Sequence, residues 1–257
     1  MRPALRYSVP LLIVLSMIGS AFVQPPLARA DNGVYLSAYW NKTITRWADS
    51  INRYAAERGL DPDLVASIIF EESHGNPGTV SSAGAVGLMQ VMPFEQGFTW
   101  RPTSQVLLDP VQNIAWGTKT LSQVIRQGQG RLHLALLAYN SGWDQINLRL
   151  TRAFAVKVLD HYARCILTNS GIDVKNVQGW KMIIVTHSSA GPVQADRVLS
   201  DGNFEPLPDF DPAFDDRTDM PHAVAYATID PNHTAWWVDV WVFPVQLQLV
   251  AGSASRP

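Results

Sequence analysis

The sequence predicts an α+β protein in which a mainly helical domain precedes a β-rich C-terminal extension. Apolar residues recur at helical spacing from residue 44 to about residue 167, as they do in helices that bury one face. After about residue 170 the chain changes to short runs of β-branched and aromatic residues, which favour strands. We therefore expect the helical domain to cover residues 31–169 and the extension to cover residues 170–257.

Two helices are predicted early in the helical domain. The first covers residues 44–58, where apolar side chains share one face and a glycine follows the last turn. The second starts at Asp61-Pro62, because aspartate is a favoured N-cap and proline fits the first helical turn. It is expected to run to about Ser73, since glycine and proline at residues 75–78 end it.

Three more helices and three strands are expected further along the chain. The helices are predicted from Asp109 through Val124, over residues 132–139 and over residues 145–167. The strands are predicted over residues 182–185, 223–229 and 235–243, with a turn at 230–233 and a continuation through Leu247 and Leu249. Residues 205–220 are rich in proline and aspartate and are predicted to be a loop.

The first thirty residues have the pattern of an export signal. Arg2 and Arg6 precede a largely apolar stretch, and Ala28-Arg29-Ala30 offers a cleavage site between small residues. The apolar stretch is short for a membrane span, which needs about 20 residues, although an uncleaved anchor remains the alternative. We expect cleavage after residue 30, no stable membrane span afterwards, and a location in the periplasm or cell-wall space.

Composition excludes several classes of function. The chain has 257 residues with 20 Lys and Arg against 22 Asp and Glu, so no basic excess points to nucleic acid. Cys165 is the only cysteine, which rules out an intramolecular disulfide. The six histidines lack metal-ligand spacing. We therefore expect no metal, no cofactor and no nucleic-acid partner.

Glu72 is the strongest candidate for chemistry. At 100° per residue from Leu64, it falls at about 80°, near the middle of the apolar arc of its helix, whereas Glu71 falls about 20° outside that arc. Glu72 is thus expected to face the interior, and Glu71 to be the solvated acid. Burial raises the pKa of a carboxyl and makes it a competent general acid. The alternative is a glutamate that caps backbone or pairs with an arginine.

The segment that follows Glu72 is a loop dense in glycine and small polar residues, over residues 75–87. Glycines such as Gly84 and Gly87 are needed where backbone takes a positive φ or closely approaches a ligand. An interior acid followed by such a loop predicts a proton donor that faces a ligand-binding cleft.

The run from Glu72 to Gln90 resembles the signature of the soluble lytic transglycosylases. The matching positions are Glu72-Ser73, Pro77, Ser81, Gly84-Ala85 and Gly87-Leu88-Met89-Gln90. Two later landmarks of the family are matched by Leu108-Asp109-Pro110 with Asn113-Ile114, and by Ala138-Tyr139-Asn140-Ser141-Gly142. Gly75 and Thr79 depart from the usual pattern. The resemblance covers residues 44 to about 167 and does not extend to residues 170–257.

The resemblance implies a lysozyme-like domain that cleaves the β-1,4 bond between N-acetylmuramic acid and N-acetylglucosamine in peptidoglycan glycan strands. Glu72 would act as general acid and then as base, giving a 1,6-anhydromuramoyl product, and Tyr139 would orient Glu72 or steady the transition state. The implied substrate-binding residues are Ser73, Ser81, Gly87, Met89, Gln90 and Asn140. For Asn140, capping of its own helix is an equal alternative.

Two other functions compete with this interpretation. One is a lysozyme-type muramidase, a hydrolase in which a second acid such as Asp144 positions water. The other is a non-catalytic glycan-binding protein of the cell wall. The extension over residues 170–257 is either a module that binds wall or partner, including cell-wall machinery, or a β-rich addition packed on the catalytic domain.

Overall fold

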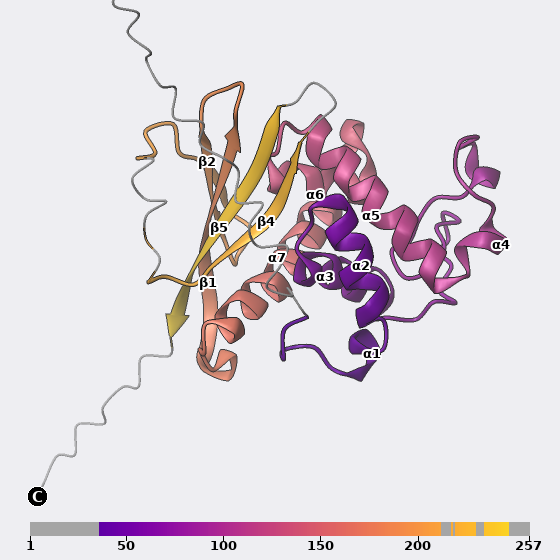
Figure 1. Cartoon of the computed structure of the whole chain (residues 1–257), viewed down its shortest axis with the longest axis horizontal. Helices are drawn as coiled ribbons and strands as arrows, with labels where there is room; N and C mark the ends of the chain where they lie inside the picture. Colours follow the sequence, from indigo (N-terminus) through magenta and orange to yellow (C-terminus); the bar gives the residue numbers. More distant parts are fainter. Residues whose placement is uncertain (1–35, 212–216, 218, 230–233, 247–257) are drawn as a thin grey trace, which may run out of the picture.

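The computed structural model describes residues 36–211, 217, 219–229 and 234–246. Helices pack against one face of a five-stranded antiparallel sheet (Figure 1), which confirms the α+β class. The predicted export signal, the turn at residues 230–233 and the continuation through Leu247 and Leu249 lie outside the described residues. Within the described part of the chain, no helix is long and apolar enough to cross a membrane.

The helix predicted over residues 44–58 is in fact two helices, α1 (Lys42–Thr45) and α2 (Ala48–Arg58). The chain leaves helical geometry at Trp47, whose ψ is 6°. The side chains of Arg46 and Trp47 both donate hydrogen bonds to the carbonyl oxygen of Gly75, at 2.6 and 3.0 Å. The break between α1 and α2 thus coincides with a tertiary contact to the loop after residue 73. The spacing of apolar residues within one segment cannot predict such a contact.

The later helices follow the prediction with changed ends. They are α3 (Pro62–Ser73), α5 (Pro110–Gln127), α6 (Leu132–Ser141) and α7 (Arg149–Asn169). The short α4 (Ser104–Leu107) and the 3₁₀ turns η2 (Phe94–Gln96), η3 (Trp143–Gln145) and η4 (Val174–Asn176) were not predicted. Helix α7 starts later than residue 145, because η3 occupies the start of the predicted segment. The N-caps Asp61 and Asp109 each accept a backbone hydrogen bond of their helix.

The sheet contains the three predicted strands and two more. Its strands are β1 (Val177–Ser188), β2 (Gln194–Leu199), β3 (Phe204–Pro206), β4 (His222–Ile229) and β5 (Ala235–Gln246), in the spatial order β3-β2-β1-β5-β4. Strand β1 is longer than the predicted 182–185, and β3 overlaps the segment predicted as a loop. Polar residues obscure the pattern in β2, where Asp196 pairs with Arg131 of the helical part at 2.8 Å.

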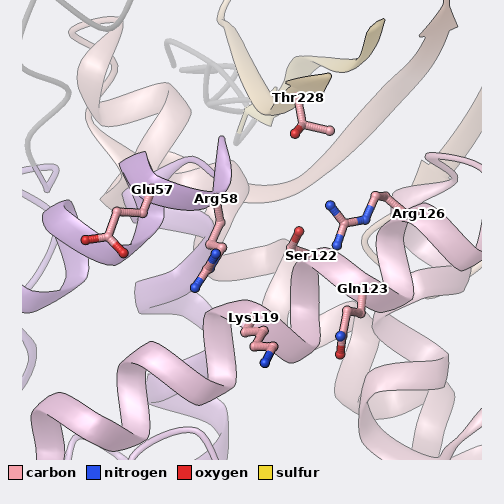
Figure 2. A pocket seen from close by; sticks show the side chains of 7 residues that line it. All are labelled: Glu57, Arg58, Lys119, Ser122, Gln123, Arg126 and Thr228. Atoms are coloured by element: carbon pink, nitrogen blue, oxygen red, sulfur yellow. The ribbon is translucent and has the colours of Figure 1, made fainter. Parts of the chain in front are cut away.

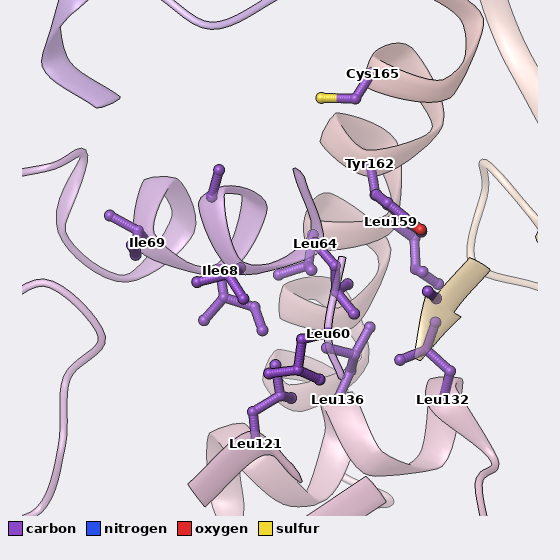
Figure 3. Close-up of a cluster of buried hydrophobic side chains, with 14 of the residues drawn as sticks. Leu60, Leu64, Ile68, Ile69, Leu121, Leu132, Leu136, Leu159, Tyr162 and Cys165 are labelled. Carbon is purple, nitrogen blue, oxygen red and sulfur yellow. The ribbon is translucent and has the colours of Figure 1, made fainter. Parts of the chain in front are cut away.

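The core of the helical part is formed by apolar side chains from all of its α-helices, α1 to α7. Figure 3 shows Leu64 and Ile68 of α3 together with Leu121 of α5, Leu136 of α6 and Leu159 of α7. All five side chains are fully buried. Burial of this kind is worth about 1.5–3 kcal/mol for each large aliphatic side chain, and it fixes the helix that carries Glu72.

The same core continues into the sheet. Met182 of β1 with Val240 and Val242 of β5 belongs to the buried cluster that includes the helix residues. The edge strand β4 is also paired with the α2–α3 connection, where the Ala227 amide donates to the Gly59 carbonyl at 2.7 Å. An unpaired strand edge invites association with another chain, and this contact covers part of that edge.

Candidate functional site

Glu72 lies in the last turn of α3 with its side chain half-buried. Within the described residues its carboxyl group makes no hydrogen bond and no ion pair. Glu72 is therefore not seen to cap backbone or to pair with an arginine. Burial, followed by the negative charge of Glu71, raises its pKa to about 8. The carboxyl is therefore protonated at neutral pH, the state that a general acid needs.

Glu71 is mostly buried, which contradicts the prediction that it is the solvated acid. Its carboxylate lies 3.1 Å from His161 Nε2 and 3.6 Å from Lys157 Nζ, both on α7. Burial raises the pKa of Glu71, but the hydrogen bond with His161 and the charge of Lys157 outweigh it and hold that pKa below its usual value. His161 is in turn fixed by Tyr39, whose hydroxyl lies 2.7 Å from Nδ1.

The two neighbouring carboxyl groups therefore differ in protonation. Glu71 is ionised by its contacts with α7, whereas Glu72 is kept neutral by burial and by the charge of Glu71. A pair of acids whose environments push their pKa values apart is a recurring arrangement of acid–base catalysis. Of the two acids, Glu72 is therefore the one that holds a proton near neutral pH.

The loop after α3 is fastened to the helices by two polar side chains. The Ser73 hydroxyl donates to the Leu88 carbonyl at 2.8 Å. The Asn113 side chain, on α5, accepts from the Met89 amide at 2.8 Å and donates to the carbonyls of Val86 and Leu107 at 2.7 and 2.9 Å. One buried amide thus uses its oxygen and its nitrogen to position the loop backbone.

Gly87 is required by this fastening. Its φ is +82°, and a Cβ atom at this position would lie 2.1 Å from the Asn113 side-chain nitrogen and 2.8 Å from the Leu107 carbonyl oxygen. Any larger residue would displace the asparagine that holds the loop. Glycine is therefore needed at position 87 for the conformation of the loop itself, whether or not a ligand approaches it.

Tyr139 reaches the loop from α6, where its hydroxyl donates to the Met89 carbonyl at 2.9 Å. Burial raises the pKa of the Tyr139 phenol, and the nearby charge of Glu72 adds to the rise, while Arg101 counteracts it. The phenol is thus neutral and lies within electrostatic reach of Glu72. Tyr139 thus joins the loop at Met89 and senses the carboxyl of Glu72.

The remaining predicted binding residues have varied surroundings. Ser81 accepts a hydrogen bond from the Ala85 amide at 3.0 Å. Gln90 has a φ of +46° and donates to two loop carbonyls. Asn140 is exposed near the end of α6. Met89 is fully buried against Gly117, and Ser73 is buried as well, so both hold the loop in place and their contact with a ligand stays a prediction.

Three residues of the site were not assigned a role from the sequence, namely Asn113, His161 and Arg101. Asn113 belongs to the match that begins at Leu108. A polar residue on the buried face of a helix is a signal that could have indicated its role in holding the loop. His161 is 90 positions from Glu71, and no local pattern links the two. Arg101, near Tyr139, also stacks over Phe98 at 4.7 Å.

The helical part of the chain thus presents the neutral carboxyl of Glu72 within electrostatic reach of the Tyr139 phenol. Residues 49–157 match the family described as Transglycosylase SLT domain. The match covers the helical part of the chain, from α2 into α7.

Comparison with known proteins gives relatives of the same kind. The chain is 36% identical over 132 residues to a transglycosylase of Enterobacteria phage PRD1, covering 49% of this chain and 46% of that protein. It is 38% identical over 101 residues to the endo-type membrane-bound lytic murein transglycosylase A of Klebsiella pneumoniae, covering 34% of this chain and 50% of that protein. The chain therefore spans about half the length of these relatives.

A solved structure of the lytic transglycosylase Slt from Pseudomonas aeruginosa shares 26% sequence identity with the chain. The alignment covers 49% of this chain and 24% of that chain with a TM-score of 0.41. A TM-score at that level supports no argument about the whole fold. The likeness to the transglycosylase SLT domain is thus a sequence match over residues 49–157.

Proposed function

We propose that the protein is a peptidoglycan lytic transglycosylase that cleaves the β-1,4 bond between N-acetylmuramic acid and N-acetylglucosamine. The observation that carries this proposal is the neutral and unpaired carboxyl of Glu72 within a transglycosylase SLT domain. Peptidoglycan glycan strands are the substrate, and the periplasm or cell-wall space is the proposed location. The murein named in the description of the Klebsiella relative supports this substrate class.

The proposed reaction uses one carboxyl group twice. Protonated Glu72 gives its proton to the glycosidic oxygen as the bond from that oxygen to the muramoyl anomeric carbon breaks. The resulting carboxylate then accepts the proton of the muramoyl 6-hydroxyl as that oxygen forms a bond to the same carbon. Glu72 ends protonated, the product is a 1,6-anhydro sugar, and no water is consumed.

Tyr139 and the loop are proposed to hold the sugar for this reaction. The Tyr139 phenol is neutral and near Glu72, so its oxygen can support the positive charge that develops at the anomeric carbon. Ser81 offers its hydroxyl group, and Gln90 its side-chain carbonyl oxygen, to the acetamido and hydroxyl groups of the sugars. The bonds from Ser73 and Asn113 keep the loop in one geometry before the substrate arrives.

Digestion of purified sacculi tests the function, because the mass of the products identifies the reaction. We expect muropeptides with a 1,6-anhydromuramoyl end, one water lighter than the products of a muramidase. Mass spectrometry of the digest measures this difference directly. Products that carry the additional water would replace the proposal with the hydrolase alternative, and an absence of products would favour a glycan-binding protein.

The rate is expected to fall at alkaline pH as Glu72 loses its proton, with a midpoint near the pKa of about 8. Because the negative charge of Glu71 contributes to that raised pKa, Glu71→Gln should move the midpoint to lower pH. Initial rates of muropeptide release from acidic to alkaline pH measure both midpoints. Glu57→Gln, at an exposed acid of α2, is the control and should leave the midpoint unchanged. An unchanged midpoint in Glu71→Gln would show that Glu71 does not act on Glu72.

We also propose that the C-terminal sheet is a structural part of the catalytic domain. Support comes from the buried cluster that helices and strands share and from the hydrogen bonds between β4 and the α2–α3 connection. In this arrangement the sheet stabilises the helices that carry Glu72 and Tyr139, and removing it would expose their apolar faces to water.

A further inference from the structure

A small cavity at the boundary between the helices and the sheet is lined largely by hydrogen-bond donors. It has a volume of about 150 Å³ and is lined by Glu57, Arg58, Lys119, Ser122, Gln123, Arg126 and Thr228. The four residues from α5 are spaced so that they share one face of that helix, while the others come from the last turn of α2 and from β4. Figure 2 shows the charged ends of Arg58, Lys119 and Arg126 around Ser122.

The cavity gathers three cations that have no anionic partner in the described part of the chain. Within the described residues Arg58, Lys119 and Arg126 form no ion pair, and the only acid of the lining, Glu57, is bound to Arg53 at 3.1 Å. Lys119 instead lies over the Trp116 ring at 4.4 Å. Three like charges gathered at one cavity repel one another, and an anion would relieve that repulsion.

Two buried polar groups lie beside the cavity. The Arg58 Nε atom is shielded from solvent and makes no hydrogen bond within the described part of the chain. The fully buried Tyr226 has a phenol oxygen without a hydrogen bond of regular geometry in the described residues. Burial raises the Tyr226 pKa, and the neighbouring Ser122, Arg126 and Thr228 counteract part of the rise. Buried polar groups are rarely left unpaired.

We propose that this cavity binds a phosphate group. Its donors come from two helices and a strand, so they surround the cavity in several directions rather than forming a single planar fork. That distribution suits the tetrahedral oxygens of phosphate better than a planar carboxylate, and arginine is well suited to phosphate recognition. The site is separate from Glu72 in the residues that form it, and it does not depend on the proposed reaction.

Calorimetric titration of the full chain with inorganic phosphate, at constant ionic strength in chloride, tests the site. We expect saturable binding to the wild type, and Arg126→Gln and Lys119→Gln should each weaken it about tenfold, the loss of one charge-assisted hydrogen bond. Arg126 is exposed, so its replacement leaves the core unchanged. Arg149→Gln, at an exposed arginine of α7, is the matched control and should bind phosphate as the wild type does.

Parallel titrations with methyl phosphate and dimethyl phosphate identify the source of the group. Binding of inorganic phosphate and methyl phosphate, but not of dimethyl phosphate, would indicate that the site takes a free phosphate or a monoester. Binding of all three would indicate that it takes a phosphodiester as well. The proposal is overturned if the wild type shows no saturable binding, if Arg126→Gln and Lys119→Gln bind as tightly as the wild type, or if Arg149→Gln loses as much affinity as they do. Sacculus digestion is unaffected by these outcomes, so failure here is distinguishable from failure of the proposed function.

Discussion

Glu72→Gln is expected to abolish the release of anhydromuropeptides, with a loss of at least roughly 10³-fold. A positioned acid–base group contributes about 10²–10⁴-fold, and here the same carboxyl is proposed to serve both proton transfers. Glutamine keeps the size of the side chain and cannot donate or accept the proton of the reaction. Quantifying muropeptides released from sacculi measures the loss.

Asp144→Asn is the informative control for this substitution. Asp144 lies on the 3₁₀ turn η3 and is exposed, and the hydrolase alternative uses it to position water. We expect its replacement to leave the rate of release unchanged. Full activity in Glu72→Gln would contradict the proposed chemistry, whereas a large loss in Asp144→Asn would support the hydrolase.

The same Glu72→Gln variant should be more stable than the wild type at pH 8. Glu72 has a folded-state pKa of about 8 against an ordinary value of 4.5, so the folded protein holds a proton that the unfolded chain releases between these values. By linkage, this group lowers the stability of the fold progressively as pH rises through that window. Thermal unfolding at pH 8 and at acidic pH should therefore show a difference between the variants that disappears on acidification.

Gly59→Ala is expected to lower the free energy of unfolding by about 2–4 kcal/mol. Gly59 has a φ of +66°, which costs an alanine about 1 kcal/mol. A Cβ atom there would also lie 1.7 Å from the Ala227 carbonyl oxygen of β4, and overpacking costs about 1–3 kcal/mol. Denaturant unfolding measures the sum of the two effects.

Gly171→Ala separates the two contributions. Gly171 also has a positive φ, of +78°, but no heavy atom lies within 4 Å of its added Cβ position. Its replacement should therefore cost only about 1 kcal/mol. Equal costs for the two variants would show that the sheet is free to move away from Gly59, and the sheet would then be a separate module rather than part of the domain.

The sequence predicts α3 well, because its start and its end depend on local features. Asp61 and Pro62 start the helix, and the apolar arc of the helix defines its buried side. The surroundings of Glu71 could not be predicted in this way, because a helical wheel contains only one helix. Its partners His161 and Lys157 come from α7, and only the packing of α3 on α7 places them beside Glu71.

The strands show the same limit. Strand β5 is recognisable from the alternation of its own apolar residues, whereas β2 contains Asp196 and Arg197 within six residues. The charge of Asp196 is acceptable in a buried position because Arg131 reaches it from the start of α6. Because Arg131 lies in a distant part of the chain, the sequence of β2 alone does not show that the charge of Asp196 is neutralised. The segment is therefore not predicted to be a strand.

The fastening of residues 86–89 by the Asn113 side chain has a thermodynamic consequence. Ordering a free backbone costs about 1–2 kcal/mol per residue in conformational entropy, and this segment loses that entropy when the protein folds rather than when a sugar binds. Association with a glycan then needs little further ordering of the protein. Under the proposed function, affinity for the glycan is thereby linked to the first turns of α5, which carry Asn113, so that loosening these turns would weaken recognition without altering a contact to the sugar.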